Sequence, residues 1–319
     1  MNITDTKALI KKLLNAPEKE RFVLCLKGHQ GIGKTQAIQQ VAEENGWNYK
    51  ALYGAQTQVE DLMGIPYLKE NNAIKENNEG EKISKFAKPI LFPDKPKTIF
   101  VLEEINRAPL DVQQAILQLL TENKFAGREL PQDTVIIVSI NPSDVNSGYN
   151  VEKLDSVFIN RICMIDVEPE LKEWLDYAND KNFNKRIRAF LSNPKNNWFF
   201  WEKPNYENIG QSLPSPRTWE IVSKILKIEN EKITFLDNLL KGVIGQEATI
   251  EFLNDWADIG IDGKDILTAQ YDRYSDLRDN KLNNQTVSQN AYSLTSLKGY
   301  IESQNYKLSS EQKVRVWIL

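Results

Sequence analysis

A glycine-rich octapeptide, residues 28–35, constrains this chain more than any other feature. It follows an apolar run at residues 22–26. Its residues, which we expect to surround bound phosphates, are Gly28, His29, Gln30, Gly31, Ile32, Gly33, Lys34 and Thr35. They satisfy the pattern G-x-x-x-x-G-K-[ST], in which the glycines let successive backbone N–H groups point at a phosphate. Lys34 would supply a point charge to the β- and γ-phosphates, and the Thr35 hydroxyl would coordinate Mg²⁺. The pattern predicts a strand, a loop and a helix that together bind a nucleotide.

Apolar runs alternate with helical patterns through the first half of the chain, which is typical of a parallel sheet covered by helices. The predicted strands are Phe22–Lys27, Asn48–Tyr53, Thr98–Leu102, Thr134–Ile140 and Ile162–Val167. The predicted helices are Asp5–Asn15, Thr35–Asn45, Gln58–Met63 and Leu110–Asn123. We therefore expect residues 1–169 to form a three-layer α/β nucleotide-binding domain with a parallel sheet.

The pattern changes after Pro169, where strand-like alternation fades and mixed-charge helical segments take over. All tryptophans except Trp47 lie in this part of the chain. We expect residues 170–319 to form a second, mainly helical domain. Its aromatic run Trp198–Trp201 is expected to pack inside that domain, because aromatic side chains bury large areas. The alternative is an exposed patch that binds a partner.

Composition excludes several classes of protein. The net charge of -4 and the pI near 5.4 disfavour a dedicated nucleic-acid-binding protein. No apolar stretch is long enough to span a membrane, and the first residues lack the layout of a secretory signal, so a cytoplasmic protein is expected. The only histidine lies in the glycine-rich loop, which excludes histidine-rich metal sites and Ser-His-Asp chemistry. Cys25 and Cys163 lie in strand-like runs and are predicted to be buried thiols in a reducing compartment.

A pair of carboxylates forms the second chemical motif. The apolar run 99–102 leads directly into Glu103 and Glu104. In nucleoside triphosphatases a carboxylate at the end of a buried strand holds Mg²⁺ or its waters, and a neighbouring Glu orients the attacking water. We therefore expect Glu103 to join Thr35 at the metal and Glu104 to be catalytic. The alternative is a pair of surface acids after a strand.

Several segments occur in an order that resembles a known family. They are Gly28–Thr35, the E-D-L-x-G run within Gln56–Gly64, Leu102–Ala108, Ser139–Pro142 and Pro216–Arg217. Over residues 20–225 the chain resembles the AAA+ ATPases of the MoxR type, within the broader group that includes dynein-like AAA modules. The resemblance implies a P-loop AAA+ core followed by a helical lid, with ATP and Mg²⁺ as cofactors. It also implies a homo-oligomeric ring, a hexamer, that acts on a partner protein, in this family often one with a von Willebrand factor A-like domain.

The resemblance also implies roles for further polar residues. Asn141 would be the first sensor, which reaches the γ-phosphate or the attacking water; the alternative is a simple Asn-Pro turn. Arg161 would be the arginine finger that reaches the nucleotide of a neighbouring subunit, and the alternative is a surface salt bridge. Arg217 would be the second sensor, at the start of a lid helix. Arg107 has a counterpart in the family, and its role stays open between an interface contact and support of the fold.

The chain departs from the family's pattern at one position, Glu103, and has a candidate segment for one of the family's insertions. The family normally has Asp where this chain has Glu103, so the carboxylate lies one methylene further out and slow hydrolysis is an open possibility. The polar segment Asn71–Lys85 is the candidate for the family's inserted hairpin, near residues 67–86, which would face the centre of a ring. A solvated loop is the alternative for that segment.

Three functions follow from these observations. The leading hypothesis is a Mg²⁺-dependent, ring-forming ATPase that remodels or matures a partner protein and binds neither nucleic acid nor membrane. The second is a nucleotide-gated binding module with little turnover, motivated by Glu103. The third is a GTP-hydrolysing motor subunit of the restriction type, motivated by the E-I-N-R segment and by residues 141–144, which are similar to an N-x-x-D motif.

Overall fold

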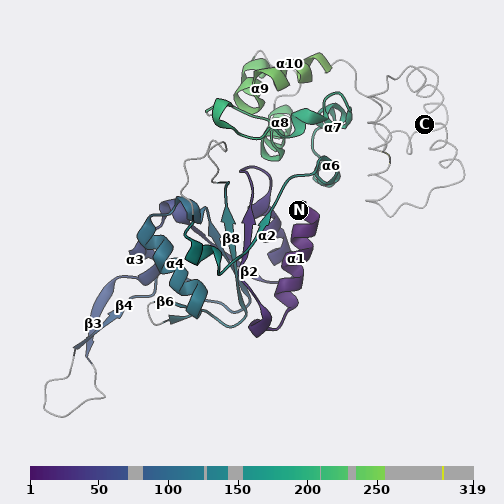
Figure 1. The fold of residues 1–319 in the computed structure, drawn as a ribbon. Coiled ribbons are helices and arrows are strands. Elements are labelled where there is room, and N and C mark those ends of the chain that lie inside the picture. Colours follow the sequence, from purple (N-terminus) through teal and green to yellow (C-terminus); the bar gives the residue numbers. More distant parts are fainter. Residues whose placement is uncertain are drawn as a thin grey trace, which may run out of the picture. The chain divides into compact units, whose positions relative to one another are not determined.

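The computed structural model of the chain describes residues 1–70, 82–125, 128–142, 154–208, 210–228, 235–255 and Leu297. The chain divides into two compact units, Met1–Glu168 and Pro169–Leu319. Figure 1 shows strands and helices in the first unit, and helices in the described part of the second. No helix within the described residues is both long enough and apolar enough to cross a membrane.

The first unit is built on a five-stranded parallel sheet with the strand order β2-β5-β8-β1-β9. These strands are β1 (Leu24–Lys27), β2 (Asn48–Tyr53), β5 (Thr98–Glu103), β8 (Thr134–Ile140) and β9 (Cys163–Asp166). All five predicted strands are confirmed: β2 and β8 have the predicted ends, and the ends of the other three differ by at most two residues. In the register, Glu103 lies opposite Ser139, and Lys27 lies opposite Ile140. The carboxyl ends of β1, β8 and β5 therefore lie side by side.

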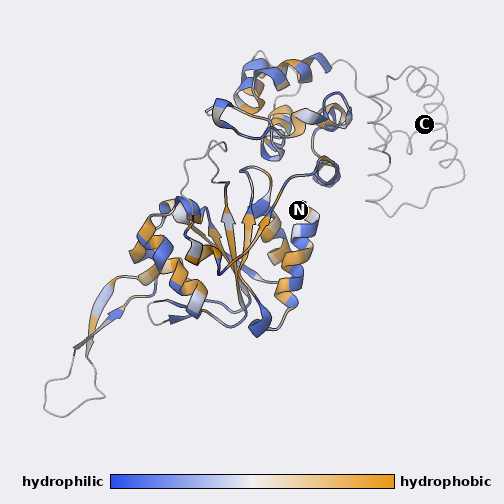
Figure 2. Cartoon of the chain, in the orientation of Figure 1, coloured by the Kyte–Doolittle hydropathy of each residue, from blue (hydrophilic) through white to orange (hydrophobic). Residues whose placement is uncertain are grey.

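Helices cover both faces of this sheet, as predicted for a three-layer fold. Figure 1 shows α1 (Ile3–Asn15) and α2 (Lys34–Glu44) on one side, and α3 (Val59–Met63) and α4 (Leu110–Glu122) on the other. The strands between them carry the apolar residues, as Figure 2 shows. Val112, Ile116 and Leu119 repeat at helical spacing along α4 and are at most 1% exposed, because this stripe packs on the sheet.

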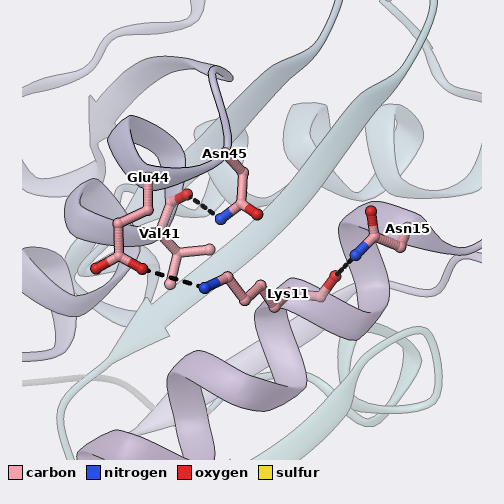
Figure 3. Close-up of polar contacts among 5 residues, drawn as sticks. All are labelled: Lys11, Asn15, Val41, Glu44 and Asn45. Atoms are coloured by element: carbon pink, nitrogen blue, oxygen red, sulfur yellow. Dashed lines mark hydrogen bonds and ion pairs between the residues drawn. The ribbon is translucent and has the colours of Figure 1, made fainter.

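Polar contacts fix the end of α2 and its contact with α1. The Lys11 ammonium group lies 3.3 Å from a Glu44 carboxylate oxygen, and this exposed ion pair, drawn in Figure 3, links the two helices. In the same view Asn15 donates to the carbonyl of Lys11, and Asn45 donates to the carbonyl of Val41. The Val41 carbonyl also accepts the backbone N–H of Asn45 at 3.2 Å, so the backbone and the side chain of Asn45 both bind the last turn of α2.

An antiparallel hairpin interrupts the α/β pattern between α3 and β5. Its strands β3 (Pro66–Glu70) and β4 (Lys82–Phe86) pair from Pro66 opposite Phe86, and the hairpin projects away from the sheet (Figure 1). The chain enters it at Gly64, where φ is +83° and a Cβ atom would lie 1.7 Å from the carbonyl oxygen of Ala87. Only glycine fits there. Two strands thus flank the predicted polar insertion, whose residues 71–81 lie outside the described residues.

A second hairpin, which the sequence analysis did not predict, follows α4. Its strands β6 (Lys124–Phe125) and β7 (Arg128–Glu129) are joined across by an ion pair of 2.7 Å between Lys124 and Glu129. The Arg128 guanidinium donates to the backbone carbonyls of Phe86 and Ala87. This contact ties the second hairpin to the base of the first.

The described part of the second unit is helical, with an aromatic core. Its helices are α6 (Leu171–Asp180), α7 (Lys185–Ser192), α8 (Pro216–Ile228), α9 (Leu236–Ile244) and α10 (Gln246–Asn254), with short 3₁₀ turns at Asn197–Phe200 and Tyr206–Asn208. Trp219 is fully buried, donates to the carbonyl of Phe199 at 2.9 Å, and packs edge-on against Phe252. In the aromatic run Phe199 and Phe200 are buried as predicted, whereas Trp198 is 52% exposed.

The prediction that both cysteine thiols are buried is wrong for one of them. Cys25 lies on the interior strand β1 and is fully buried, but Cys163 on β9 is exposed. The reason is that β9 is an edge strand, and three of its four residues are exposed. An apolar run of this length does not reveal whether a strand lies inside the sheet or at its edge.

Candidate functional site

The glycine-rich loop connects β1 to α2 at the carboxyl end of the sheet. Gly31 and Gly33 have φ angles of +78° and +105°, which side chains other than glycine rarely adopt. At Gly28 a Cβ atom would lie 2.6 Å from the carbonyl oxygen of Val167, beyond the end of β9. The Gly28 amide also donates to the carbonyl of Ile140 at the end of β8, at 3.1 Å. The loop is therefore held between the ends of the two strands next to β1.

Lys34 is the first residue of α2 and is only 7% exposed. Its ammonium group donates to the carbonyl oxygens of Gly28 at 2.6 Å and His29 at 2.9 Å. The side chain thus folds back over the loop, so the cation lies where a phosphate on the loop would meet it. This is the placement that the motif predicts for a lysine that binds the β- and γ-phosphates.

Thr35 and Glu103 come together although they are 68 residues apart. The Thr35 hydroxyl donates to a Glu103 carboxylate oxygen at 2.6 Å, and Glu103 is 4% exposed at the end of β5. The longer Glu therefore reaches the threonine predicted to bind the metal. A hydroxyl and a carboxylate are oxygen ligands of the kind that Mg²⁺ prefers, and Mg²⁺ usually adds substrate phosphates and waters. Among the described residues, no group of three or more His, Cys, Asp or Glu side chains is arranged to hold a metal ion.

Glu104 makes a sharp turn immediately after β5. Its φ of +53° lies in the left-handed region, which is uncommon for residues other than glycine. Its amide donates to the carbonyl of Ser139 on β8 at 2.7 Å, and a Cβ at Gly54 would lie 2.9 Å from its carbonyl oxygen. The turn is therefore fixed by contacts on two sides. The Glu104 carboxylate pairs with the Arg107 guanidinium at 2.8 Å, and both side chains are partly exposed to solvent.

Asn141 lies just past the end of β8, between the loop and the carboxylates, and is 3% exposed. Its amide nitrogen is buried and has no hydrogen-bond partner among the described residues. Buried donors are nearly always paired, so an unpaired one at a strand end favours a ligand oxygen at this place. The geometry therefore favours the predicted sensor role over a simple Asn-Pro turn.

Asn106 is a buried residue of this site for which the sequence analysis gave no role. It is 1% exposed, and its amide donates to the backbone carbonyl of Asn141 at 2.9 Å. It therefore joins the turn after Glu104 to the segment that carries the sensor. Its position within the E-I-N-R segment was the available signal, but the burial that marks its contact depends on tertiary structure.

The two remaining predicted arginines lie on the surface of their units. Arg161 is exposed, after the short helix α5 (Ser156–Ile159), and makes no ion pair with any described residue. The alternative of a surface salt bridge is therefore not supported there. Arg217 is exposed in the first turn of α8, in the second unit, and its contact with a nucleotide stays a prediction.

Burial also controls the protonation of groups around the loop. It raises the pKa of Cys25 from 9.0 to about 12, and the nearby charge of Lys34 only partly opposes this. Burial raises the pKa of Tyr49 on β2 as well, and the negative charge of Glu103 adds to the effect. Both groups are neutral at pH 7 even with their ordinary pKa values, and the raised pKa values keep them neutral at more alkaline pH.

The family assignment agrees with this geometry. Residues 23–162 match the family model described as the AAA domain of the dynein-related subfamily. This segment is an AAA domain of that subfamily. Every site residue named above lies within this AAA domain, except Val167 and Arg217, which follow it in the chain. A P-loop and an AAA domain indicate nucleotide binding and, in general, nucleotide hydrolysis.

Comparison of the whole chain with solved structures gives weaker likenesses. A mutant of RuvB from Thermotoga maritima is 13% identical, with a TM-score of 0.42 over 97% of this chain and 89% of that one. NtrX from Brucella abortus is 12% identical, with a TM-score of 0.42 over 97% of this chain and 67% of that one. None of the curated proteins matches the chain significantly. The strand order and the loop described above, and not these likenesses, define the fold.

Proposed function

We propose that this chain is a Mg²⁺-dependent ATPase of the MoxR type, which assembles into a ring and couples ATP hydrolysis to the remodelling of a partner protein. The observation that carries the proposal is the cluster formed at the ends of three neighbouring strands. There the Thr35 hydroxyl lies 2.6 Å from the Glu103 carboxylate, beside Glu104 and the unpaired amide of Asn141. These are the parts that phosphoryl transfer to water requires.

Each residue has a distinct task in this proposal. The loop N–H groups and Lys34 would bind the β- and γ-phosphates. Thr35 and Glu103 would hold a Mg²⁺, which when bound would supply positive charge to offset the phosphate charge. Glu104 orients the attacking water and accepts its proton as the oxygen adds to the γ-phosphorus and ADP leaves. Asn141 donates to the γ-phosphate or to the water. Arg161 of a neighbouring subunit would stabilise the charge on the transferred phosphoryl group.

Steady-state phosphate release with Mg²⁺, compared between ATP and GTP, tests this proposal. We expect turnover of ATP that is lost in Glu104→Gln, while both proteins bind the nucleotide equally well. A Gln114→Glu change at an exposed position on α4 serves as a surface control and should leave the rate unchanged. A clear preference for GTP would instead support the restriction-type motor; part of the N-x-x-D segment that suggested it, residues 143 and 144, lies outside the described residues.

One observation favours the second candidate, a nucleotide-gated binding module. The Glu104 carboxylate is paired with Arg107, and Glu103 replaces the Asp of the family, so two features of the site could slow turnover. Tight nucleotide binding without multiple turnover would support this candidate. In that case Glu103→Asp should raise the rate, because it restores the shorter carboxylate, whereas in the ATPase proposal it changes the rate little.

A further inference from the structure

A short chain of hydrogen bonds holds the Arg161 guanidinium against α4. Arg161 Nε donates to the hydroxyl oxygen of Thr121 at 2.7 Å, and that hydroxyl donates to the carbonyl of Leu117 at 2.8 Å, one turn back in the helix. A second guanidinium nitrogen, Nη1, donates to the carbonyl of Val157 at 2.8 Å. The hydroxyl therefore both accepts and donates, which fixes its orientation, and the planar guanidinium is held at two of its three nitrogens.

The charge of Arg161 is not compensated by these contacts. All its partners among the described residues are neutral oxygens, and Nη2 makes no hydrogen bond with any described residue. Arg107 differs, because its guanidinium is paired with the Glu104 carboxylate. An exposed arginine that is anchored by neutral groups keeps both its full charge and a free N–H edge for an anion.

Thr121 gives this arrangement a mechanical link to the catalytic turn. It lies in the last turn of α4, and at the other end of that helix Gln113 donates to the carbonyl of Ala108, in the turn that follows Glu104. The same rigid helix thus carries the anchor of Arg161 and supports the turn of the subunit's own Glu104.

From this geometry we infer that Thr121 is a positioning residue for Arg161, whose free Nη2 edge it directs toward the γ-phosphate held by a neighbouring subunit. The inference deepens the proposed function and rests on it. Thr121 itself touches no nucleotide in this account. Its hydroxyl reduces the number of orientations that the long arginine side chain samples in the free subunit. Less conformational entropy is then lost when the guanidinium binds the phosphate.

Thr121→Val tests the inference, because it removes the hydroxyl from an exposed position while it keeps the shape of the side chain. We expect kcat for ATP to fall about tenfold in the assembled protein, as loss of one hydrogen bond to a charged group implies, with KM for ATP and ATP affinity unchanged. Thr121→Ser keeps the hydroxyl and should restore most of the rate. Gln118→Ala, at another exposed position of α4, removes a contact with Glu122 and should have no effect.

A double variant separates positioning from a general loss of structure. Because Thr121 would act only through Arg161, adding Thr121→Val to Arg161→Ala should leave unchanged the small residual rate of Arg161→Ala, measured as single-turnover phosphate release with enzyme in excess. A further fall would overturn the inference, and so would a wild-type rate in Thr121→Val when Arg161→Ala is inactive. If the wild-type protein hydrolyses no ATP, or if Arg161→Ala is fully active, the proposed function fails first, and the two failures are thereby distinguished.

Discussion

Among single residues, Lys34 is expected to have the largest effect on nucleotide binding by the loop. Its ammonium group is nearly buried and is held by the carbonyl oxygens of Gly28 and His29. Carbonyl dipoles stabilise a buried cation less well than phosphate charges do, so a bound phosphate would gain a strong, charge-assisted interaction with this residue.

Lys34→Ala is therefore expected to weaken MgATP binding by at least a hundredfold, which isothermal titration calorimetry would measure directly. Lys11→Ala is the matched control, since Lys11 forms an exposed ion pair with Glu44 that joins α1 to α2 (Figure 3). It should leave the affinity unchanged and lower the free energy of unfolding by no more than about 1 kcal/mol. Equal loss of affinity in both variants would contradict the assignment of the loop.

Cys25 provides a test of burial beneath the loop. Because its pKa rises from 9.0 to about 12 on folding, the thiol is protonated in both states below pH 9 and contributes no pH dependence there. Between pH 9 and 12 the unfolded chain ionises and the folded one does not, so the free energy of unfolding falls as the pH rises. At pH 10 these two pKa values correspond to a loss of about 1 to 2 kcal/mol.

Urea unfolding at pH 8 and pH 10, compared between the wild-type protein and Cys25→Ala, isolates this contribution from those of other groups. The wild-type protein should lose more stability than the variant. If both lose the same amount, Cys25 is not buried as described. Cys163, which is exposed on the edge strand β9, should react with a thiol reagent in the folded protein while Cys25 does not.

At the scale of elements, the base of the β3–β4 hairpin depends on one glycine. Gly64 combines a φ of +83° with a carbonyl oxygen only 1.7 Å from where a Cβ would lie. Gly46, after α2, has a similar φ of +68°, but nothing lies within 4 Å of its Cβ position. A side chain at either position would therefore strain the backbone through its positive φ. Only at Gly64 would it also clash with a neighbouring atom.

Gly46→Ala should lower the free energy of unfolding by about 1 kcal/mol, the cost of a left-handed backbone for a residue with a Cβ. Gly64→Ala should cost clearly more, because the backbone at Ala87 must move, and it should speed proteolysis between residues 64 and 90. Thermal unfolding and limited proteolysis of the two variants measure this. Equal effects would show that the hairpin base is not packed as described.

The sequence predicts elements better than it predicts their surroundings. The five strands of the parallel sheet and the helices α1 to α4 follow from periodicity and the loop motif, and their ends lie within two residues of the predicted ones. The exposure of Cys163 was missed because edge position is a property of the whole sheet. The small β6–β7 hairpin was missed because its two-residue strands are too short for a periodic signal.

The candidate site was predicted in the same uneven way. Lys34, Thr35 and Glu103 follow from motifs, since fixed spacing along the chain implies a fixed geometry. The role of Asn106 and the anchoring of Arg161 by Thr121 depend on contacts between segments 35 and 40 residues apart, which no local pattern encodes.

At the scale of the whole molecule, the proposed site is incomplete in one subunit. Arg161 is anchored on the surface with one guanidinium edge that bonds to none of the described residues, and the proposal gives it a task only at the nucleotide of a neighbour. Such head-to-tail contacts generate closed rings when the rotation between subunits closes. Hydrolysis should therefore depend on assembly, and specific activity should fall on dilution.

Mixing two inactive variants tests this central claim most directly. Glu104→Gln subunits lack the catalytic carboxylate but supply Arg161, whereas Arg161→Ala subunits lack the finger but keep Glu104. In randomly mixed rings of equal parts, about one quarter of the interfaces combine an intact Glu104 with an intact Arg161. We predict that the mixture recovers phosphate release to roughly that fraction of the wild-type rate, although each variant alone is inactive. A mixture that stays as inactive as its components would contradict a site shared between subunits.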